Sequence, residues 1–236
     1  MALHLGDLSS ESEKHAARVK ATWDTVALFL PCDYARTKGK VEPYVSRRLR
    51  HIVSACVSTN TNNKGPTSIL DVGCGDGAII DFLDDHGMYA YKGLDVSSEM
   101  IDLGRKRHPQ HDLMEGSFPN SLSKDESFDV IVFNGSLQFF QDTRQALMDA
   151  SARLKPAKGS RIVLSHVEGA RFVQEECRTS GGVAVRGMPN RSSLEGYANE
   201  LSMRVVYKEE LLVDTQYDEK LDGDDDKFYL VVLERI

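Results

Sequence analysis

Alternating acidic and glycine residues in one short segment have the spacing of a nucleoside-binding turn. Asp71, Gly73, Gly75 and Gly77 follow an apolar run that begins at Ile69. Glycine has no Cβ, so it adopts positive φ angles freely and lets a ligand approach the main chain. A helix after such a turn offers unpaired N–H groups and the positive end of its dipole. The segment therefore predicts a strand, a ligand-binding turn and a helix.

The elements that must position this turn are strands and helices in alternation. Apolar residues with helical period favour helices, and short apolar runs bounded by turn residues favour buried strands. The N-terminal part is predicted to form helices within 8–57 and a loop at 59–66. Strands are predicted at 69–72, 89–95, near 113–114, and at 128–133 and 161–165, with helices between them at 78–86, after the cap Ser97, and at 142–154. An irregular glycine-rich stretch, a helix at 192–201 and strands at 203–214 and 228–233 complete the chain order. Such alternation implies a largely parallel sheet with helices on both faces and a ligand beyond the carboxyl ends of the strands.

Composition limits the class of protein. A chain of 236 residues with 41% hydrophobic content is long enough for one well-cored α/β domain. The net charge of -7 argues against a surface for nucleic acid. The four cysteines form no closely spaced pair, which favours a reducing compartment without disulfides or zinc. We expect a soluble cytoplasmic protein, or an organellar one after removal of a transit peptide, with no membrane segment.

These motifs resemble those of the class I S-adenosylmethionine (SAM)-dependent methyltransferases. The best-matched part runs from about residue 69 to 167, and the two last strands resemble the antiparallel ending of that family. The resemblance implies a Rossmann-like, doubly wound, mostly parallel seven-stranded sheet with an antiparallel last strand. It implies an N-terminal helical cap over the active site at 1–64 and a SAM-binding domain at 65–236. The cofactor would be SAM and the product S-adenosylhomocysteine (SAH).

The resemblance also assigns roles to residues. Asp71 would hold the amino group of the cofactor, directly or through water, by a charge-assisted hydrogen bond. Asp95, at the end of the second strand, would accept hydrogen bonds from both ribose hydroxyls, although it could instead cap the helix that follows. The complete set of cofactor-binding candidates is Asp71, Gly73, Cys74, Gly75, Gly77, Asp95, Val96, Met100, Gly116, Ser117, Phe118, Asn134 and Gly135.

One position departs from the commonest family pattern. The family usually places an acidic residue after the third strand, where it meets the adenine amino group. This chain has Gly116, Ser117 and Phe118 there. The Ser117 hydroxyl can accept a hydrogen bond and Phe118 can cover the ring, but neither supplies a carboxylate.

The acceptor site has weaker signals. Methyl transfer needs a base only when the acceptor carries a proton at the working pH. His166, at the end of the fifth strand, is the candidate catalytic base, and a hydrogen bond from the backbone to this histidine is the alternative. Candidate substrate-binding residues are Trp23, Tyr34, Arg36, Gln138 and Glu168, and Tyr44, Leu137, Phe139, Arg171, Arg178 and Arg186 are further pocket or loop candidates.

The same residues are compatible with three more kinds of protein. The glycines also fit a relaxed dinucleotide fingerprint, although Asp71 would then place a negative charge near a pyrophosphate. A SAM-binding regulatory protein without catalysis and a protein methyltransferase would carry the same first motif. We expect a small-molecule acceptor, no nucleic acid, a monomer or homodimer, and no metal. The acidic run at 222–226 is expected to be a solvated hairpin loop, with calcium binding as its alternative.

Overall fold

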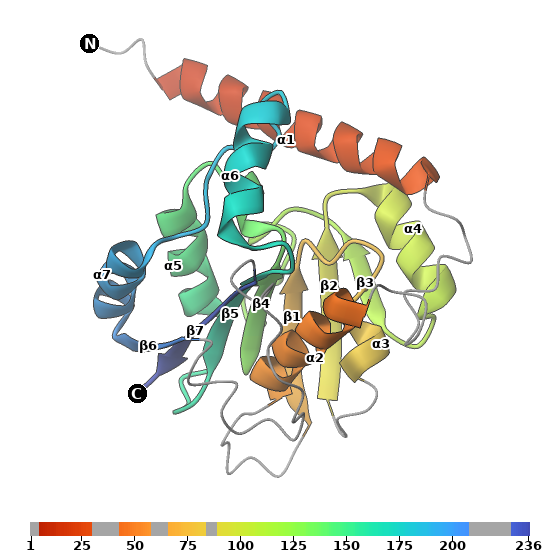
Figure 1. Ribbon diagram of the computed structural model, residues 1–236. Coiled ribbons are helices and arrows are strands. Elements are labelled where there is room, and N and C mark those ends of the chain that lie inside the picture. The colour runs from red at the N-terminus through yellow and green to blue at the C-terminus, as the bar shows by residue number, and fades with distance from the viewer. Residues whose placement is uncertain (1–4, 30–42, 58–65, 84–88, 208–227) are drawn as a thin grey trace.

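Seven strands form a single sheet in the part of the chain that the computed structural model describes, which is residues 5–29, 43–57, 66–83, 89–207 and 228–236. Their spatial order is β3-β2-β1-β4-β5-β7-β6. In chain order the strands are β1 Thr67–Val72, β2 Tyr89–Asp95, β3 Asp112–Glu115, β4 Val130–Asn134, β5 Arg161–His166, β6 Met203–Tyr207 and β7 Tyr229–Arg235. β1 to β5 are parallel, and β7 runs antiparallel between β5 and β6 (Figure 1). The predicted Rossmann-like sheet with an antiparallel last strand is confirmed.

Helices cover both faces of this sheet. The helices of the described residues are α1 Leu5–Phe29, α2 Pro43–Val57, α3 Ile80–Leu83, α4 Ser98–Arg107, α5 Thr143–Arg153, α6 Gly169–Thr179 and α7 Arg191–Leu201, with a 3-10 turn η1 at Leu137–Phe139. Strand β4 shows how the two faces arise, because Val130 and Val132 join one hydrophobic cluster and Ile131 and Phe133 join the other. Successive strand side chains point to opposite faces, so a strand buried on both sides reads as an unbroken apolar run.

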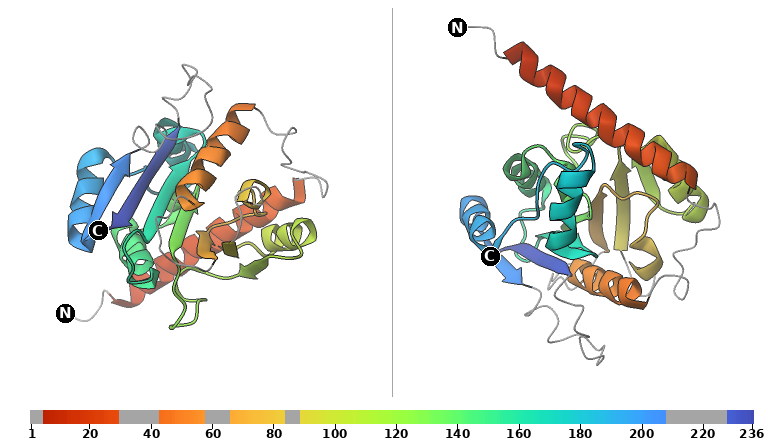
Figure 2. Two further views of the ribbon diagram at one scale, coloured as in Figure 1. Left: turned by 90° about the horizontal axis from the view of Figure 1, so that it is seen from below. Right: turned by 45° about the horizontal axis from the view of Figure 1, so that its top comes forward.

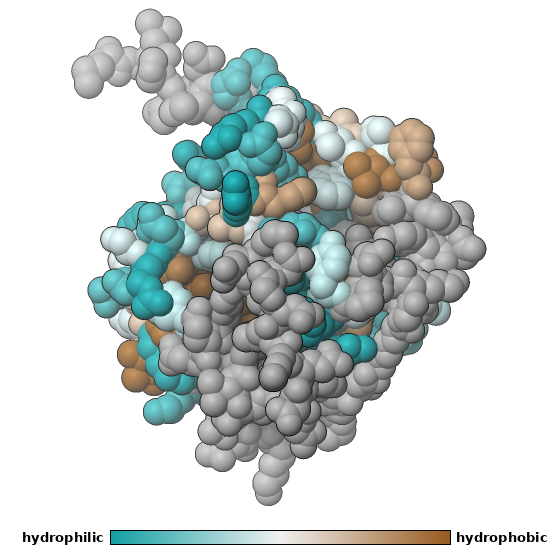
Figure 3. Space-filling view, viewed as in Figure 1, coloured by the Kyte–Doolittle hydropathy of each residue, from teal (hydrophilic) through white to brown (hydrophobic). Residues whose placement is uncertain are grey.

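The two N-terminal helices have different places. Side chains of α2 such as Leu49, Ile52 and Val53 lie in the core cluster that also contains α3 residues. Helix α1 instead crosses the carboxyl ends of the strands and reaches α4 (Figures 1 and 2). Its last turn exposes Leu28 and Phe29, and brown, hydrophobic atoms gather at the α4 end of α1 in Figure 3. Thus α2 is part of the core, and α1 lies over the edge where ligands of parallel sheets bind.

Among the described residues, helix α6 is an element that the sequence pattern missed. We expected an irregular stretch after the fifth strand, but Gly169–Thr179 form α6. Only Gly169 and Val173 of this helix are buried, although its sequence is strongly amphipathic at the helical period. Arg171 and Arg178 therefore lie on a helix rather than on a loop, and Arg178 pairs with Glu175 at 2.9 Å.

Other boundaries differ by small amounts. Helix α3 begins at Ile80, two residues later than expected, after a turn that includes three glycines. Phe128 precedes β4 and forms an isolated bridge with Leu154. The predicted cap is confirmed, because Ser97 Oγ accepts a hydrogen bond from Met100 N at 3.1 Å. The acidic run at 222–226 and the second half of the strand expected at 203–214 lie outside the described residues.

Some further observations concern only the described part of the chain. No helix there is both long and apolar enough to cross a membrane. Within the same residues, no group of three His, Cys, Asp or Glu side chains has a metal-binding arrangement. Cys56, Cys74 and Cys177 are free thiols, and Cys32 lies outside the described residues.

Candidate functional site

A cavity of about 420 Å³ lies where β1, β2 and β4 end, beneath helix α1. Its volume falls within the range typical of small-molecule sites. Most of the predicted cofactor-binding residues line it, together with the predicted substrate residue Trp23. They are Gly73, Cys74, Gly75, Asp95, Val96, Met100, Gly116, Ser117, Phe118, Asn134 and Gly135. The structure thus brings together residues from four separate strand ends.

The glycine turn has the backbone that its sequence predicts. Gly73, Gly75 and Gly77 have φ angles of +72°, +55° and +82°. A Cβ on Gly73 would lie 2.4 Å from Ser136 Cβ, so this glycine is needed for packing against the turn after β4. A Cβ on Gly75 would meet nothing within 4 Å. Because Gly75 lines the cavity, that open space is available to a ligand close to the main chain.

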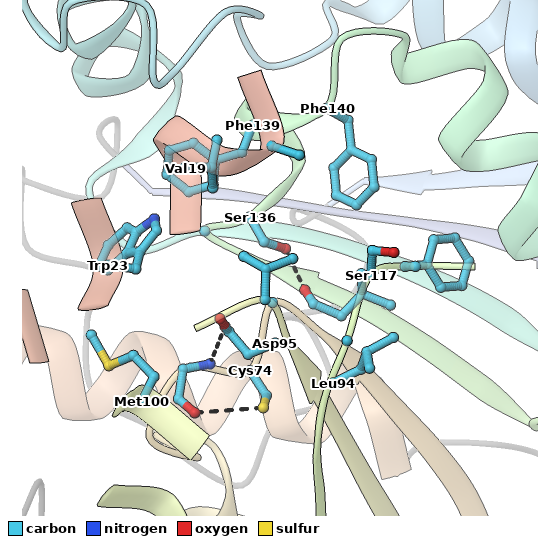
Figure 4. A pocket seen from close by; sticks show the side chains of 18 of the residues that line it. Val19, Trp23, Cys74, Leu94, Asp95, Met100, Ser117, Ser136, Phe139 and Phe140 are labelled. Atoms are coloured by element: carbon cyan, nitrogen blue, oxygen red, sulfur yellow. Dashed lines mark hydrogen bonds between the residues drawn. The ribbon is translucent and has the colours of Figure 1, made fainter. Parts of the chain in front are cut away.

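Asp95 is held by two backbone groups. Its Oδ2 accepts a hydrogen bond from Gly75 N at 2.8 Å, and its Oδ1 accepts one from Ser97 N at 2.9 Å. Burial raises the pKa of Asp95, and the two N–H groups partly offset that effect. Figure 4 shows the carboxylate at the cavity, bonded to the glycine turn. Each carboxylate oxygen has a second lone pair, so Asp95 can accept hydrogen bonds from a diol as well.

Asp71 and Gly77 do not line the cavity. Asp71 is 2% exposed, and its Oδ2 accepts a hydrogen bond from the Tyr91 hydroxyl at 2.8 Å. Its Oδ1 has no hydrogen-bond partner among the described residues. Burial raises the pKa of Asp71 to about 7, against the lowering effect of Tyr91. Because the Asp71 carboxylate does not line the cavity, it could interact with a ligand amino group only through a bridging group such as a water molecule.

The cavity wall after β3 is aromatic. Phe118 packs edge-on against Phe140 with ring centroids 6.4 Å apart, and both residues line the cavity. Ser117 lines it as well, with its backbone N bonded to Ser121 Oγ at 3.0 Å. The sequence reasoning missed Phe140, which follows η1 and carries no motif of its own.

Helix α1 supplies the roof. His15, Val19 and Trp23 all line the cavity, and Trp23 packs edge-on against Phe139 with centroids 5.6 Å apart. Figure 4 shows Trp23 and Val19 across the cavity from Cys74 and Met100. His15 Nε2 lies 2.8 Å from the Phe139 carbonyl oxygen. Residues spaced by four share one helix face, so the spacing of Val19 and Trp23 could have identified His15 too.

The predicted catalytic and acceptor residues at β5 do not line the cavity. His166 is 6% exposed and stacks on Phe172. Its Nδ1 accepts a hydrogen bond from Glu168 N at 3.2 Å, and burial lowers its pKa to about 4. A neutral histidine whose Nδ1 accepts must carry its proton on Nε2. This arrangement matches the alternative expectation, a histidine that is hydrogen-bonded to the backbone.

The remaining substrate candidates are also placed by backbone and side-chain contacts. Gln138 Nε2 donates to Gly135 O at 3.1 Å, and Glu168 accepts from the Tyr44 hydroxyl at 3.0 Å. Arg186 donates from Nε to Gln141 O at 2.8 Å. Tyr34 and Arg36 lie outside the described residues.

The fold and the cavity define the class: a Rossmann-like sheet of seven strands with a cavity at a glycine turn. Residues 69–157 match the family described as a methyltransferase domain. Over this segment the chain is similar to class I SAM-dependent methyltransferases.

Similar proteins include several methyltransferases. The chain is 28% identical over 107 residues to an 18S rRNA (guanine-N(7))-methyltransferase of Bos taurus, covering 45% of this chain and 36% of the relative. It is 29% identical over 116 residues to a malonyl-[acyl-carrier protein] O-methyltransferase of Priestia megaterium, covering 48% and 42%. The chain thus spans less than half the length of these curated relatives. The structure of the plantazolicin methyltransferase BpumL in complex with a monoazolic desmethylPZN analog and SAH has a TM-score of 0.59 at 15% identity, and the match covers 96% of this chain and 98% of that chain.

Proposed function

We propose that this protein is a SAM-dependent methyltransferase with a small-molecule acceptor. The observation that carries the proposal is the pair formed by Asp95 and Gly75 at the cavity. A buried carboxylate at the end of β2 is bonded to a glycine N–H whose Cα faces open space. These two features suit a ribose diol and the methionine part of the cofactor, which is the arrangement that the family resemblance implies.

The residues that line the cavity fit SAM. Asp95 would hold the ribose, Val96 and Met100 would contact the adenine with Ser117 and Phe118, and the Gly73–Gly75 backbone with Asn134 and Gly135 would flank the methionine part. Bound SAM supplies a methyl group on a sulfonium. The protein contributes orientation and exclusion of water, since displacement at this carbon requires alignment more than a protein nucleophile. Trp23 and Val19 exclude water from above.

A base supplied by His166 is not part of the proposal. His166 does not line the cavity, and with its proton on Nε2 it has no free ring nitrogen to take a proton from an acceptor. Gly135 lines the cavity, and a Cβ on it would lie 3.8 Å from His166 Cδ2, the atom next to Nε2. An acceptor that ionises without help, or one with no proton to lose, suits this arrangement.

A small acceptor is supported by the roof and by charge. Helix α1 lies over the cavity, so a large polymer would have to displace it. The net charge of -7 opposes the approach of a polyanion. The relatives act on rRNA and on an acyl-carrier-linked substrate by their names, so acceptor size is the property that an experiment must decide.

The cofactor is tested by calorimetric titration with SAH, with NAD as the control ligand. We expect micromolar binding of SAH alone. In Asp95→Ala the affinity should fall by about 100-fold, because two ribose donors lose a charged acceptor. Asp102→Ala, on the exposed side of α4, is the matched control and should bind like the wild type. Binding of NAD, or equal binding by both variants, would contradict the assignment.

The acceptor is tested by transfer of a radioactive methyl group from SAM to a cell extract separated into small-molecule, protein and RNA fractions. Label in the small-molecule fraction is the expected result. Label in protein or RNA would replace the proposed acceptor class. Absence of label in every fraction, with SAH binding intact, would favour a SAM-binding protein without catalysis.

A further inference from the structure

Two side chains of helix α1, Lys20 and Asp24, contact the segment that follows Asp95 and leads into helix α4. Lys20 Nζ donates to Val96 O at 3.1 Å and to Ser98 Oγ at 2.9 Å. It also pairs with Glu115, at the end of β3, at 3.0 Å. One ammonium group on the roof thus bonds to the ends of two neighbouring strands.

Asp24 lies one helical turn further and holds the same loop from its other side. Its Oδ1 accepts a hydrogen bond from Ser97 Oγ at 2.7 Å. Against the raising effect of burial, the Ser97 hydroxyl and the Glu99 backbone N–H lower the pKa of this carboxylate. Its Oδ2 lies 3.4 Å from Lys20 Nζ. The carboxylate therefore lies at the N-terminus of α4, where the helix dipole favours a negative charge.

These contacts lead directly to the ribose-binding carboxylate. Ser97, whose hydroxyl donates to Asp24, is the residue whose backbone N donates to Asp95 Oδ1. Asp24 on α1 is therefore connected through Ser97 to Asp95, which lines the cavity. Val19 and Trp23, which cover the cavity, flank Lys20 on the same helix.

We propose that Lys20 and Asp24 form a clasp that holds α1 closed over the cofactor and orients Asp95 toward the ribose. The clasp consists of these two side chains and their partners Val96, Ser97, Ser98, Glu99 and Glu115. Lys20 and Asp24 are positioning residues, since they act on the ligand through Asp95. This inference deepens the proposed function and rests on SAM or SAH as the ligand.

The contacts predict a specific effect on ribose recognition. Asp24→Ala removes the acceptor for Ser97 and keeps a strong helix former in α1. Glu11→Ala is the matched control, because Glu11 pairs with Lys14 at 2.7 Å on the exposed side of the same helix. Binding of SAH and of its 2′-deoxyribose analogue is measured for the wild type and for both variants.

In the wild type we expect SAH to bind about tenfold more tightly than the deoxy analogue. In Asp24→Ala this preference should shrink to about twofold, because a misoriented carboxylate gains little from the 2′-hydroxyl. Lys20→Met should change the preference in the same direction, and Glu11→Ala should leave it unchanged. A variant that loses equal affinity for both ligands would show that Asp24 only stabilises the roof, and the orienting role would be wrong.

A second measurement does not depend on the ligand. Hydrogen exchange of the ligand-free protein should be about tenfold faster in the α1 amides near Asp24 in Asp24→Ala, and unchanged in Glu11→Ala. Exchange equal to that of the wild type would overturn the clasp. If the wild type does not bind SAH at all, the proposed function fails, and the exchange result still decides whether α1 is held by these two residues.

Discussion

Two carboxylates at the ends of neighbouring strands, Asp71 and Asp95, have different surroundings. Asp95 has a backbone N–H on each oxygen, whereas within the described part of the chain only one Asp71 oxygen has a partner, the Tyr91 hydroxyl. An ionised carboxylate that is buried with one hydrogen bond is poorly solvated. Asp71 is therefore a group that costs stability when it is charged, and Asp95 is a group prepared for a ligand.

Asp71 gives the folded state a pH dependence. Its pKa is about 7 in the fold against an ordinary value of 3.8, so the folded protein binds more protons than the unfolded chain between these values. The stability contributed by this group is fully present below about pH 4 and is lost as the pH rises to about 7, at roughly 1.4 kcal/mol per unit of pKa difference. In Asp71→Asn, the free energy of unfolding of the ligand-free protein should fall less over this range. Urea unfolding at several pH values measures it, and parallel curves for the two proteins would contradict the assignment.

The glycines of the turn differ in what they serve. Gly75→Ala should cost about 1 kcal/mol of stability from its positive φ and should weaken SAH binding severely, because the added methyl group occupies ligand space. Gly73→Ala should destabilise the protein by more, because its Cβ would overlap Ser136. Thermal unfolding and calorimetry of both variants separate the effects. Equal stability of the two variants would be evidence against this division of roles.

At the scale of elements, β7 is held between its neighbours by a shared glutamate. Glu234 on β7 pairs with Arg161 of β5 at 2.6 Å and with Arg204 of β6 at 2.7 Å. The Arg161 side chain is 5% exposed and that of Arg204 is 56% exposed. The same carboxylate therefore forms one buried ion pair and one exposed pair.

Replacement of Glu234 and replacement of Arg204 should lower the free energy of unfolding by different amounts. Glu234→Ala should lower the free energy of unfolding by about 3 kcal/mol, because Arg161 remains buried without its counter-charge. Arg204→Ala should lower it by less than about 1 kcal/mol, since water screens the exposed pair. Denaturant unfolding compares them. A similar small loss in both variants would mean that the Arg161 hydrogen bonds to Gly159 O and Ala55 O are sufficient for it.

At the scale of the whole molecule, charge and the position of α1 limit the partners. The chain has 36 acidic against 29 basic side chains. A polyanion approaching such a surface gains little from counterion release. We expect binding of structured RNA weaker than about 100 μM at physiological salt. Fluorescence anisotropy with a labelled RNA hairpin measures this affinity. Tight, salt-dependent binding would contradict the expectation and favour an RNA acceptor.

Local physical chemistry accounts for the parts of the fold and site that the sequence by itself determined. Alternating glycines require a turn with positive φ, Ser97 caps the helix after β2, and the apolar run at 128–133 requires a strand buried on both faces. Each depends on neighbouring residues, so each could be read from the chain. Residues 169–179 are also strongly amphipathic at the helical period, so helix α6 could have been predicted in the same way.

Only the tertiary structure decided the contacts between distant segments. Asp24 meets Ser97 across 73 positions, and His15 meets Phe139 across 124. No periodicity encodes such pairs, because they depend on where α1 crosses the sheet. The same holds for Asp71, whose hydrogen-bond partner is the Tyr91 hydroxyl on the neighbouring strand, and for His166, whose proton position follows from the backbone turn after β5. The sequence determined the class of ligand site, and packing decided which of its polar groups face the ligand.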